Sequence, residues 1–245
     1  MSWLAPPAHE RGITTLTLDS PANRNALSAP LVAALTEALD ACATDRSVRA
    51  VVLTHTGNTF CAGADLKAPA DPHAFVALMR RVVTLPKPVV ARVTGHVRAG
   101  GLGLLGACDI SVAGPDSSFA LTESRLGLAP AVISLPLLPR LDPRAAARYY
   151  LTGERFDATE AARTGLVTLA AEDVDKALVP VLDGLRRASP QGLAASKELV
   201  TATVLETFDQ DAEDLIARSA ALFASDGARE GMTAFLERRD PAWRL

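Results

Sequence analysis

Two glycine-containing loops carry residues whose types and spacing could do chemistry. Gly100, Gly101 and Gly103 follow the apolar run "KPVVARV" and lead into apolar sequence with helical character, while a second loop, "FCAGADLK" (60–67), follows another apolar run. A glycine-rich turn from a strand into a helix places free N–H groups at the positive end of the helix dipole. Bare backbone also lets a carbonyl group approach closely. Two such N–H groups that converge would form an oxyanion hole.

Glu123 is the acid that we expect to handle protons at this site. It is flanked by the apolar sequences "FAL" and "LGLAP", so its carboxyl group should be partly desolvated. Desolvation raises the pKa of a carboxyl group, which suits general acid–base catalysis near neutral pH. A glutamate in the first turn of a helix is also favoured by the helix dipole, so a purely structural role is the alternative.

The glycines admit two other interpretations. Gly101, Gly103 and Gly106 match the dinucleotide-binding pattern G-x-G-x-x-G, but the helical sequence after them is too short for a Rossmann crossover, and Asp109 comes too early to bind a ribose. Close packing alone would explain Gly106. It explains three glycines within four residues poorly, because each helix-interior glycine costs about 1 kcal/mol relative to alanine.

Other catalytic classes find no support in the sequence. It contains no HExxH motif, no cysteine and histidine cluster at metal-binding spacing, and no GxxxxGK[ST] phosphate loop. No GxSxG elbow accompanies the four histidines, so a serine-hydrolase triad is not indicated. No prosthetic group or metal is implied.

Composition limits the class of protein further. With 245 residues, 49% of them hydrophobic, the chain can bury one large core. A formal net charge of −3 gives no reason to expect nucleic acid or an anionic membrane as a partner. The start "MSWLAPPAHERG" lacks the basic and apolar regions of a secretory signal, and three cysteines without CxxC spacing fit a reducing compartment. We therefore expect a soluble, cytoplasmic protein.

The elements that must position these loops alternate along the N-terminal half. Strand patterns at 13–18, 48–55 and 87–93 are separated by helical patterns at 29–43 and 71–85, which predicts right-handed crossovers and a parallel sheet. Ser28 is a plausible N-cap of the first helix. Short apolar pieces follow at 109–114 and 117–123, and from about residue 132 the sequence is almost wholly helical. The pattern predicts an α/β half followed by a helical C-terminal third.

Together these segments resemble the crotonase (enoyl-CoA hydratase/isomerase) superfamily over nearly the whole chain. The matching segments, in the order and at the spacing of the family, are "DSPANRNALS", "TFCAGADLK", "KPVVARVTGHVRAGGLGLLGACDISVA", "FALTESRLGLAPA", "LTGERFDATEAARTGLV" and "FLERRDPAW". The resemblance implies an α/β fold, the ClpP-like spiral ββα core, with a C-terminal α-helical trimerisation region. It divides the chain into a spiral core at 1–190 and a helical oligomerisation region at 191–245.

The resemblance also implies roles for particular residues. The N–H groups of Ala64 and Gly100 would bind the thioester oxygen and stabilise an enolate, with Glu123 as the catalytic acid and base. The substrate is a CoA thioester, which comes and goes without a separate cofactor. CoA would contact the two loops and the last helix, the latter often across a subunit boundary. The residues implied for CoA binding are Arg24, Ala26, Ala62, Asp65, Leu66, Phe235 and Arg238.

The sequence departs from the two-glutamate members of this family at one position. Their first catalytic acid lies three residues after the oxyanion glycine, where this chain has Gly103. Asp109 cannot replace it, because the acid that ends the glycine helix in such proteins is structural. His96 stands near the same loops, although a lone histidine there is more often structural. We expect the space above Gly103 to hold solvent or a branch of the acyl group.

These features lead to one preferred function and two alternatives. The first is an enoyl-CoA hydratase with a single glutamate, and "LTESRLGLAPAVIS" resembles in particular the branch acting on branched acyl-CoAs such as methylglutaconyl-CoA. The second is a Δ3,Δ2-enoyl-CoA isomerase, for which one base suffices. The third is a non-catalytic acyl-CoA-binding paralogue. Apolar C-terminal helices and the resemblance together predict a homotrimer or a dimer of trimers.

Overall fold

The architecture is known from a computed structural model, which describes residues 3–65 and 68–245. The described strands are β1 (Ala8–Glu10), β2 (Ile13–Leu18), β3 (Ala50–His55), β4 (Thr59–Cys61), β5 (Val89–Val93), β6 (His96–Arg98), β7 (Ile110–Ala113), β8 (Ser118–Ala120), β9 (Phe156–Asp157) and β10 (Leu169–Ala170). The α-helices are α1 (Ala29–Thr44), α2 (Pro72–Thr84), α3 (Gly100–Ala107), α4 (Ser134–Leu137), α5 (Pro143–Thr152), α6 (Ala158–Arg163), α7 (Val174–Arg187), α8 (Pro190–Phe223) and α9 (Asp226–Glu237). Two 3-10 helices, η1 (Pro21–Asn23) and η2 (Glu123–Leu126), complete the set.

The strands form two sheets. The larger has the order β1-β2-β3-β5-β7-β10, parallel except for β1, and the smaller has the order β4-β6-β8-β9, parallel except for β9. From β3 onward the chain repeatedly places one strand in the large sheet, one in the small sheet and then a helix. This spiral ββα arrangement confirms the α/β fold class predicted from the sequence.

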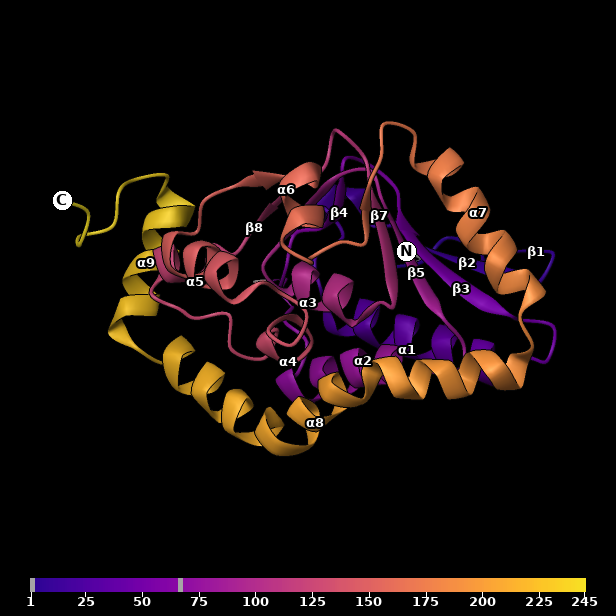
Figure 1. Cartoon of the computed structure of the whole chain (residues 1–245). Helices are drawn as coiled ribbons and strands as arrows, with labels where there is room; N and C mark the ends of the chain where they lie inside the picture. The colour runs from indigo at the N-terminus through magenta and orange to yellow at the C-terminus, as the bar shows by residue number, and fades with distance from the viewer. Residues whose placement is uncertain (1–2, 66–67) are drawn as a thin grey trace.

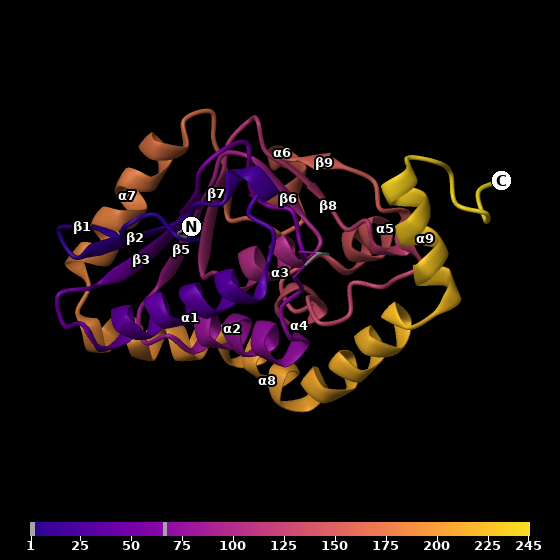
Figure 2. The same ribbon diagram turned by 180° about the vertical axis from the view of Figure 1, so that it is seen from behind.

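Helices cover both faces of the large sheet (Figures 1 and 2). Val51 and Leu53 of β3 belong to the core that α1 and α2 share, while Val52 on the other face packs with Val174 and Leu178 of α7. All six residues of β3 are buried, as expected of a parallel strand covered on both sides. The continuous apolar run at 48–55 therefore predicted its environment correctly.

Helix α1 begins where the sequence predicted. The Ser28 hydroxyl oxygen accepts a hydrogen bond from Leu31 N at 3.4 Å, and Pro30 lies in the first turn, where its missing N–H costs nothing. The short strands β4 and β6 were not predicted. Each has only three residues, too few for an alternating pattern to appear, and β6 lies inside the stretch that drew attention for its glycines.

Helix α8 is a single helix of 34 residues that runs along the outer side of α2 before the chain turns into α9 (Figure 1). The proposed division of the chain at residue 190 coincides with its first residue and stays a prediction. None of the described helices is both long and apolar enough to cross a membrane.

A buried ion pair attaches α8 to the core. Lys197 Nζ lies 2.7 Å from Asp109 Oδ2, with the two side chains only 5% and 9% exposed. Lys197 also donates to the carbonyl oxygens of Val82 and Lys87, and Asp109 accepts from Val89 N at 2.7 Å. Burial raises the pKa of Asp109 and lowers that of Lys197, and the ion pair opposes both shifts. Asp109 therefore serves the packing of α8 at the end of the glycine helix, which fits the structural role expected of it.

Replacing Lys197 is expected to destabilise the fold strongly. In Lys197→Met the Asp109 carboxylate would remain buried without its counter-ion, at a cost of about 3–5 kcal/mol in the free energy of unfolding. Urea unfolding of the variant and of wild type measures the difference. Lys176→Met is the matched control, because Lys176 pairs with Asp173 at the surface and is 85% exposed. A loss from Lys197→Met no larger than that of the control would contradict the assignment.

Candidate active site

The two glycine loops meet at the edge of the small sheet. Strands β4 and β6 are parallel neighbours, so the loops that follow them start side by side. A Cβ atom placed on Gly63 would lie 2.8 Å from the Cβ of Ala99 and 3.3 Å from Gly100 N. A Cβ atom on Gly100 would lie 3.7 Å from Ala64 N. Bare backbone is therefore needed for the two loops to approach, and the sequence-based prediction that they converge is correct.

The N–H groups of Ala64 and Gly100 remain available for a ligand. Leu27 N donates to Gly63 O, and Asp65 N donates to Leu27 O, so the N–H of Ala64 between them points away from residue 27. Gly100 is the first residue of α3, where a helix offers its N–H no acceptor. Across the described residues, neither N–H donates a backbone hydrogen bond. Both N–H groups therefore lie on the two facing loops without a main-chain acceptor among the described residues.

The backbone before Gly100 is strained. Ala99 has a φ of +46° and a ψ of −122°, a conformation that an L-residue with a side chain rarely adopts. It is held by hydrogen bonds from its N–H to Ala120 O and from Leu102 N to its own carbonyl oxygen. This conformation sets the direction in which the N-terminus of α3 starts.

Glu123 is buried from solvent at the start of η2. Its residue is 9% exposed, and its backbone carbonyl oxygen accepts hydrogen bonds from the N–H groups of Gly127 and Leu128. Burial raises the pKa of the carboxyl group to about 7. Within the described part of the chain, its Oε2 atom is buried and has no hydrogen-bond partner. A carboxyl group with this pKa can both take and return a proton near neutral pH.

The space above Gly103 is filled. A Cβ atom placed on Gly103 would lie 2.6 Å from Ile133 Cγ2 and 2.8 Å from Met79 Sδ, closer than such atoms can approach. The prediction of room for solvent or an acyl branch there is therefore wrong. The reason is tertiary, because Met79 comes from α2 and Ile133 from the segment that folds back over α3. Side chains from elsewhere occupy the place where other family members were expected to carry an acid.

The loops implied for CoA binding lie against each other. Ala62 N donates to Arg24 O at 3.1 Å, and Asn23 Nδ2 donates to Asp65 Oδ2 at 3.2 Å. Ala26 is buried beside them, and Arg24 has a φ of +58°. Leu66, which was also implied, lies outside the described residues. The structure thus brings together Arg24, Ala26, Ala62 and Asp65.

Phe235 and Arg238 are not brought to these loops within one chain. Phe235 is 61% exposed, and Arg238, also exposed, caps the C-terminus of α9. Helix α9 itself packs on η2, since a Cβ atom on Gly231 would lie 2.5 Å from the backbone of Leu126. The last helix therefore supports the turn that carries Glu123, while its two implied CoA contacts face outward.

His96 is engaged elsewhere. Its Nδ1 atom lies 3.0 Å from Ser118 Oγ, which Arg98 also contacts. Burial, followed by the charges of Arg98 and Arg155, lowers the pKa of His96. These contacts favour a structural role for the ring.

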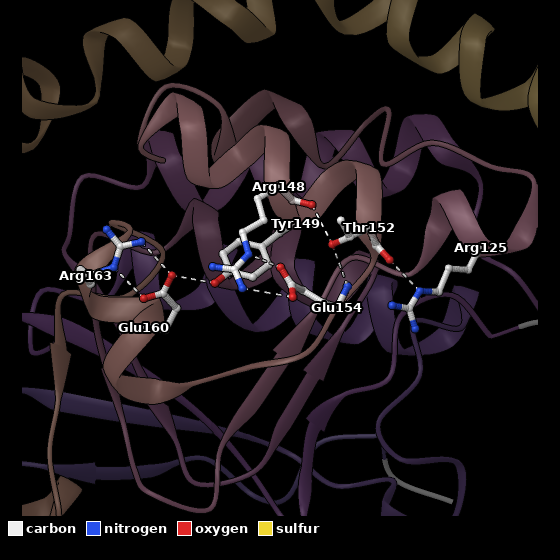
Figure 3. Close-up of polar contacts among 7 residues, drawn as sticks. All are labelled: Arg125, Arg148, Tyr149, Thr152, Glu154, Glu160 and Arg163. Carbon is white, nitrogen blue, oxygen red and sulfur yellow. Dashed lines mark hydrogen bonds and ion pairs between the residues drawn. The ribbon is translucent and has the colours of Figure 1, made fainter.

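Sequence reasoning missed one polar pair between α4 and α5, the helix that packs against the turn of Glu123. The Tyr150 hydroxyl lies 3.1 Å from Ser134 Oγ, and both line a cavity of about 730 Å³ between the segment 129–139 and α8. Figure 3 shows how Arg125, two residues after Glu123, donates to the carbonyl oxygen of Thr152, two residues after Tyr150. A tyrosine pair in a helical pattern gives no indication of which ring faces a site, so no sequence signal marked Tyr150.

Known proteins and solved structures are similar to this chain over nearly its whole length. The model of the enoyl-CoA hydratase/isomerase family matches residues 8–245. An enoyl-CoA hydratase crystal structure from Mycobacterium avium is 56% identical, with a TM-score of 0.94 and complete coverage of both chains. A carnitinyl-CoA dehydratase of Salmonella typhimurium is 33% identical over 95% of each chain. A Bacillus subtilis protein named "probable enoyl-CoA hydratase" is 32% identical over 97% of each chain.

The fold and the comparisons define the class as an α/β enzyme of the crotonase type, which acts on CoA thioesters. The chain belongs to the enoyl-CoA hydratase/isomerase family.

Proposed function

We propose that this enzyme is an enoyl-CoA hydratase that adds water across the 2,3 double bond of an acyl-CoA with a single glutamate. The observation that carries this proposal is the pairing of a buried Glu123, with its pKa raised to about 7, and a Gly103 position closed by Ile133. One proton-transfer group, Glu123, would then serve a substrate held by the two loop N–H groups. The same group must act first as base and then as acid.

The reaction follows from this arrangement. The thioester oxygen accepts hydrogen bonds from Ala64 N and Gly100 N, which stabilise negative charge on it. Glu123 takes a proton from water while the water oxygen bonds to C3 and the double-bond electrons move toward the thioester oxygen, forming an enolate. Glu123 then returns the proton to C2. Atoms and charge balance, and no group other than water is consumed.

Double-bond isomerisation is the second candidate. A single carboxyl group can take a proton from C2 of a 3-enoyl-CoA and return it to C4, and the filled position at Gly103 is compatible with that reaction. The two N–H donors would stabilise negative charge on the thioester oxygen of the dienolate, as they would for the enolate in hydration. The difference lies in whether water reaches C3.

A panel of acyl-CoA substrates separates the two functions. Loss of the conjugated-thioester absorbance from a 2-enoyl-CoA, together with a mass gain of one water, is expected of a hydratase. The panel should include straight-chain and branched substrates, methylglutaconyl-CoA among them, because the branched class is our inference for the acyl group. A protein that adds no water to any 2-enoyl-CoA, but creates the conjugated band from a 3-enoyl-CoA, would overturn the hydratase proposal in favour of the isomerase.

The CoA moiety would lie along the two loops formed by Arg24, Ala26, Ala62 and Asp65. The hydrogen bond from Ala62 N to Arg24 O supports this placement, since it holds the two loops together. Phe235 and Arg238 would serve CoA from a neighbouring subunit, because both are exposed in the single chain. The three described cysteines are free and buried, which agrees with a cytoplasmic location.

A homotrimer or a dimer of trimers is the expected assembly. Large apolar side chains are exposed on α8 and α9, including Leu199 at 80%, Val200 at 74%, Phe235 at 61% and Leu236 at 68%. Such surface is usually covered by a partner. Sedimentation at micromolar concentration should give three or six chains per particle. A stable monomer would contradict both the assembly and the role of Phe235 across a subunit boundary.

A further inference from the structure

The proposed hydratase function leaves one requirement unmet, which is a second contact for the water. A water molecule that attacks C3 must present a lone pair to carbon, so both of its hydrogens should be held by acceptors. Glu123 can hold one of them. The place above Gly103 offers no acceptor, because Ile133 and Met79 fill it with apolar atoms.

Tyr150 is the polar side chain that we consider for this requirement. Helix α5, which carries it, packs against η2, which carries Glu123. Ser124 Oγ donates to Leu151 O at 3.3 Å, so the residue after Glu123 is bonded to the residue after Tyr150. The charge of Glu123 also acts weakly on Tyr150. Burial is the main cause that raises the pKa of Tyr150 to about 12, the Ser134 hydrogen bond opposes it, and the charge of Glu123 adds to it.

Hydrogen-bond counting fixes the direction of the Tyr150 hydroxyl. Ser134 Oγ donates to Pro130 O at 2.6 Å, and a carbonyl oxygen can only accept. The single proton of Ser134 is thereby used. The contact of 3.1 Å between Ser134 and Tyr150 must then be a donation from the phenol to Ser134 Oγ. The Tyr150 oxygen is left with lone pairs only, so it can accept a further hydrogen bond but cannot donate one.

We propose that Tyr150 positions the attacking water by accepting its second hydrogen bond, in the place of a second carboxylate. One water hydrogen points to Glu123 and leaves as the proton that Glu123 takes. The other points to the Tyr150 oxygen and stays on the oxygen atom that bonds to C3, where it becomes the hydroxyl hydrogen of the product. Tyr150 itself gains and loses no proton, because its own proton stays on the bond to Ser134.

This role predicts a specific difference between two reactions of the same site. Hydration needs the positioned water. Exchange of the C2 protons of a saturated acyl-CoA with deuterium oxide needs only Glu123 and the two N–H donors. Tyr150→Phe keeps the ring and removes the acceptor, so it should lower hydration about tenfold, the rate equivalent of one neutral hydrogen bond. The rate of C2 exchange and the KM for the 2-enoyl-CoA should both stay within about twofold of the wild-type values. That change is well below the effect of losing one hydrogen bond.

Tyr149→Phe is the matched control. Tyr149 is on the same helix, but its hydroxyl donates to Glu160 at 2.6 Å, and Glu160 also pairs with Arg163, as Figure 3 shows. This variant should change neither reaction. Thermal unfolding of both variants shows whether the fold is retained, and the ratio of hydration to exchange is independent of the fraction of folded enzyme.

The outcomes are distinct. A Tyr150→Phe enzyme that hydrates as fast as wild type, or that loses hydration and exchange in equal measure, would overturn the role of Tyr150 and leave the proposed function standing. A wild type that exchanges C2 protons but hydrates no 2-enoyl-CoA would overturn the hydratase function, and the water-positioning role with it. A selective loss of hydration supports both.

Discussion

Glu123→Gln is expected to lower the turnover of a 2-enoyl-CoA by on the order of 100-fold or more, because it removes the proton-transfer group of the proposed mechanism. Glutamine has nearly the shape of glutamic acid, so the affinity for acyl-CoA should change only a few-fold. Steady-state kinetics and a thermal shift with acyl-CoA measure the two quantities. Glu160→Gln, a carboxyl group in the surface network with Tyr149 and Arg163, is the control and should retain activity.

The pH dependence gives a second readout of the same residue. Because the pKa of Glu123 is raised to about 7, the base form accumulates as pH rises through that value, and kcat/KM for hydration should rise with it. The Glu123→Gln variant should lack this dependence. If the variant keeps activity within about threefold of wild type, far short of the loss of a general base, the acid lies elsewhere and His96 is the next residue to replace.

Stability should respond in the opposite direction. The folded pKa of Glu123 lies above the ordinary value of 4.5, so folding favours the protonated form. Its contribution to stability is complete below about pH 4.5 and is lost as pH rises through about 7. Glutamine carries no charge, so Glu123→Gln should be more stable than wild type at pH 8 by up to about 3 kcal/mol. At pH 4.5 the two should unfold alike.

The sequence predicted the parts of the site that depend on local pattern. The apolar run of β3, the Ser28 cap of α1 and the glycines of the two loops each follow from neighbouring residues. The convergence of Ala64 and Gly100 could also be predicted, because loops after adjacent parallel strands share one edge of a sheet. Glu123 was predicted to be desolvated from its apolar flanks alone, and it is.

What the sequence could not show depends on residues distant along the chain. Ile133 and Met79 close the space at Gly103, and neither lies near it in sequence. The orientation of Tyr150 depends on the packing of α5 on η2 and on Ser134, which has used its proton on Pro130. A pattern of residue types predicts which element a residue belongs to, but not which side chain from another element fills the volume beside it.

The filled space at Gly103 makes a strong prediction for Gly103→Glu. Its Cβ atom alone would overlap Ile133 and Met79, an overpacking that costs about 1–3 kcal/mol, and the carboxyl group would be buried among apolar atoms. We expect a total loss of more than about 5 kcal/mol, comparable to the whole stability of many domains. The variant should therefore fail to accumulate as folded protein, and a second carboxylate would not assist hydration.

Ile133 supplies the matched test of that explanation. Gly103→Ala should cost about 1–3 kcal/mol by overpacking, and Ile133→Ala about 2–5 kcal/mol by leaving a cavity. Since the added methyl group enters the space that Ile133 vacates, the double variant should be more stable than the sum of the single effects by 1 kcal/mol or more, of the order measured for residues in contact. Urea unfolding of the four proteins gives this coupling. Additive effects would show that Ile133 does not fill the space beside Gly103. A Gly103→Glu enzyme that folds normally and hydrates faster than wild type would show the same. Either result would remove the structural basis of the single-glutamate mechanism.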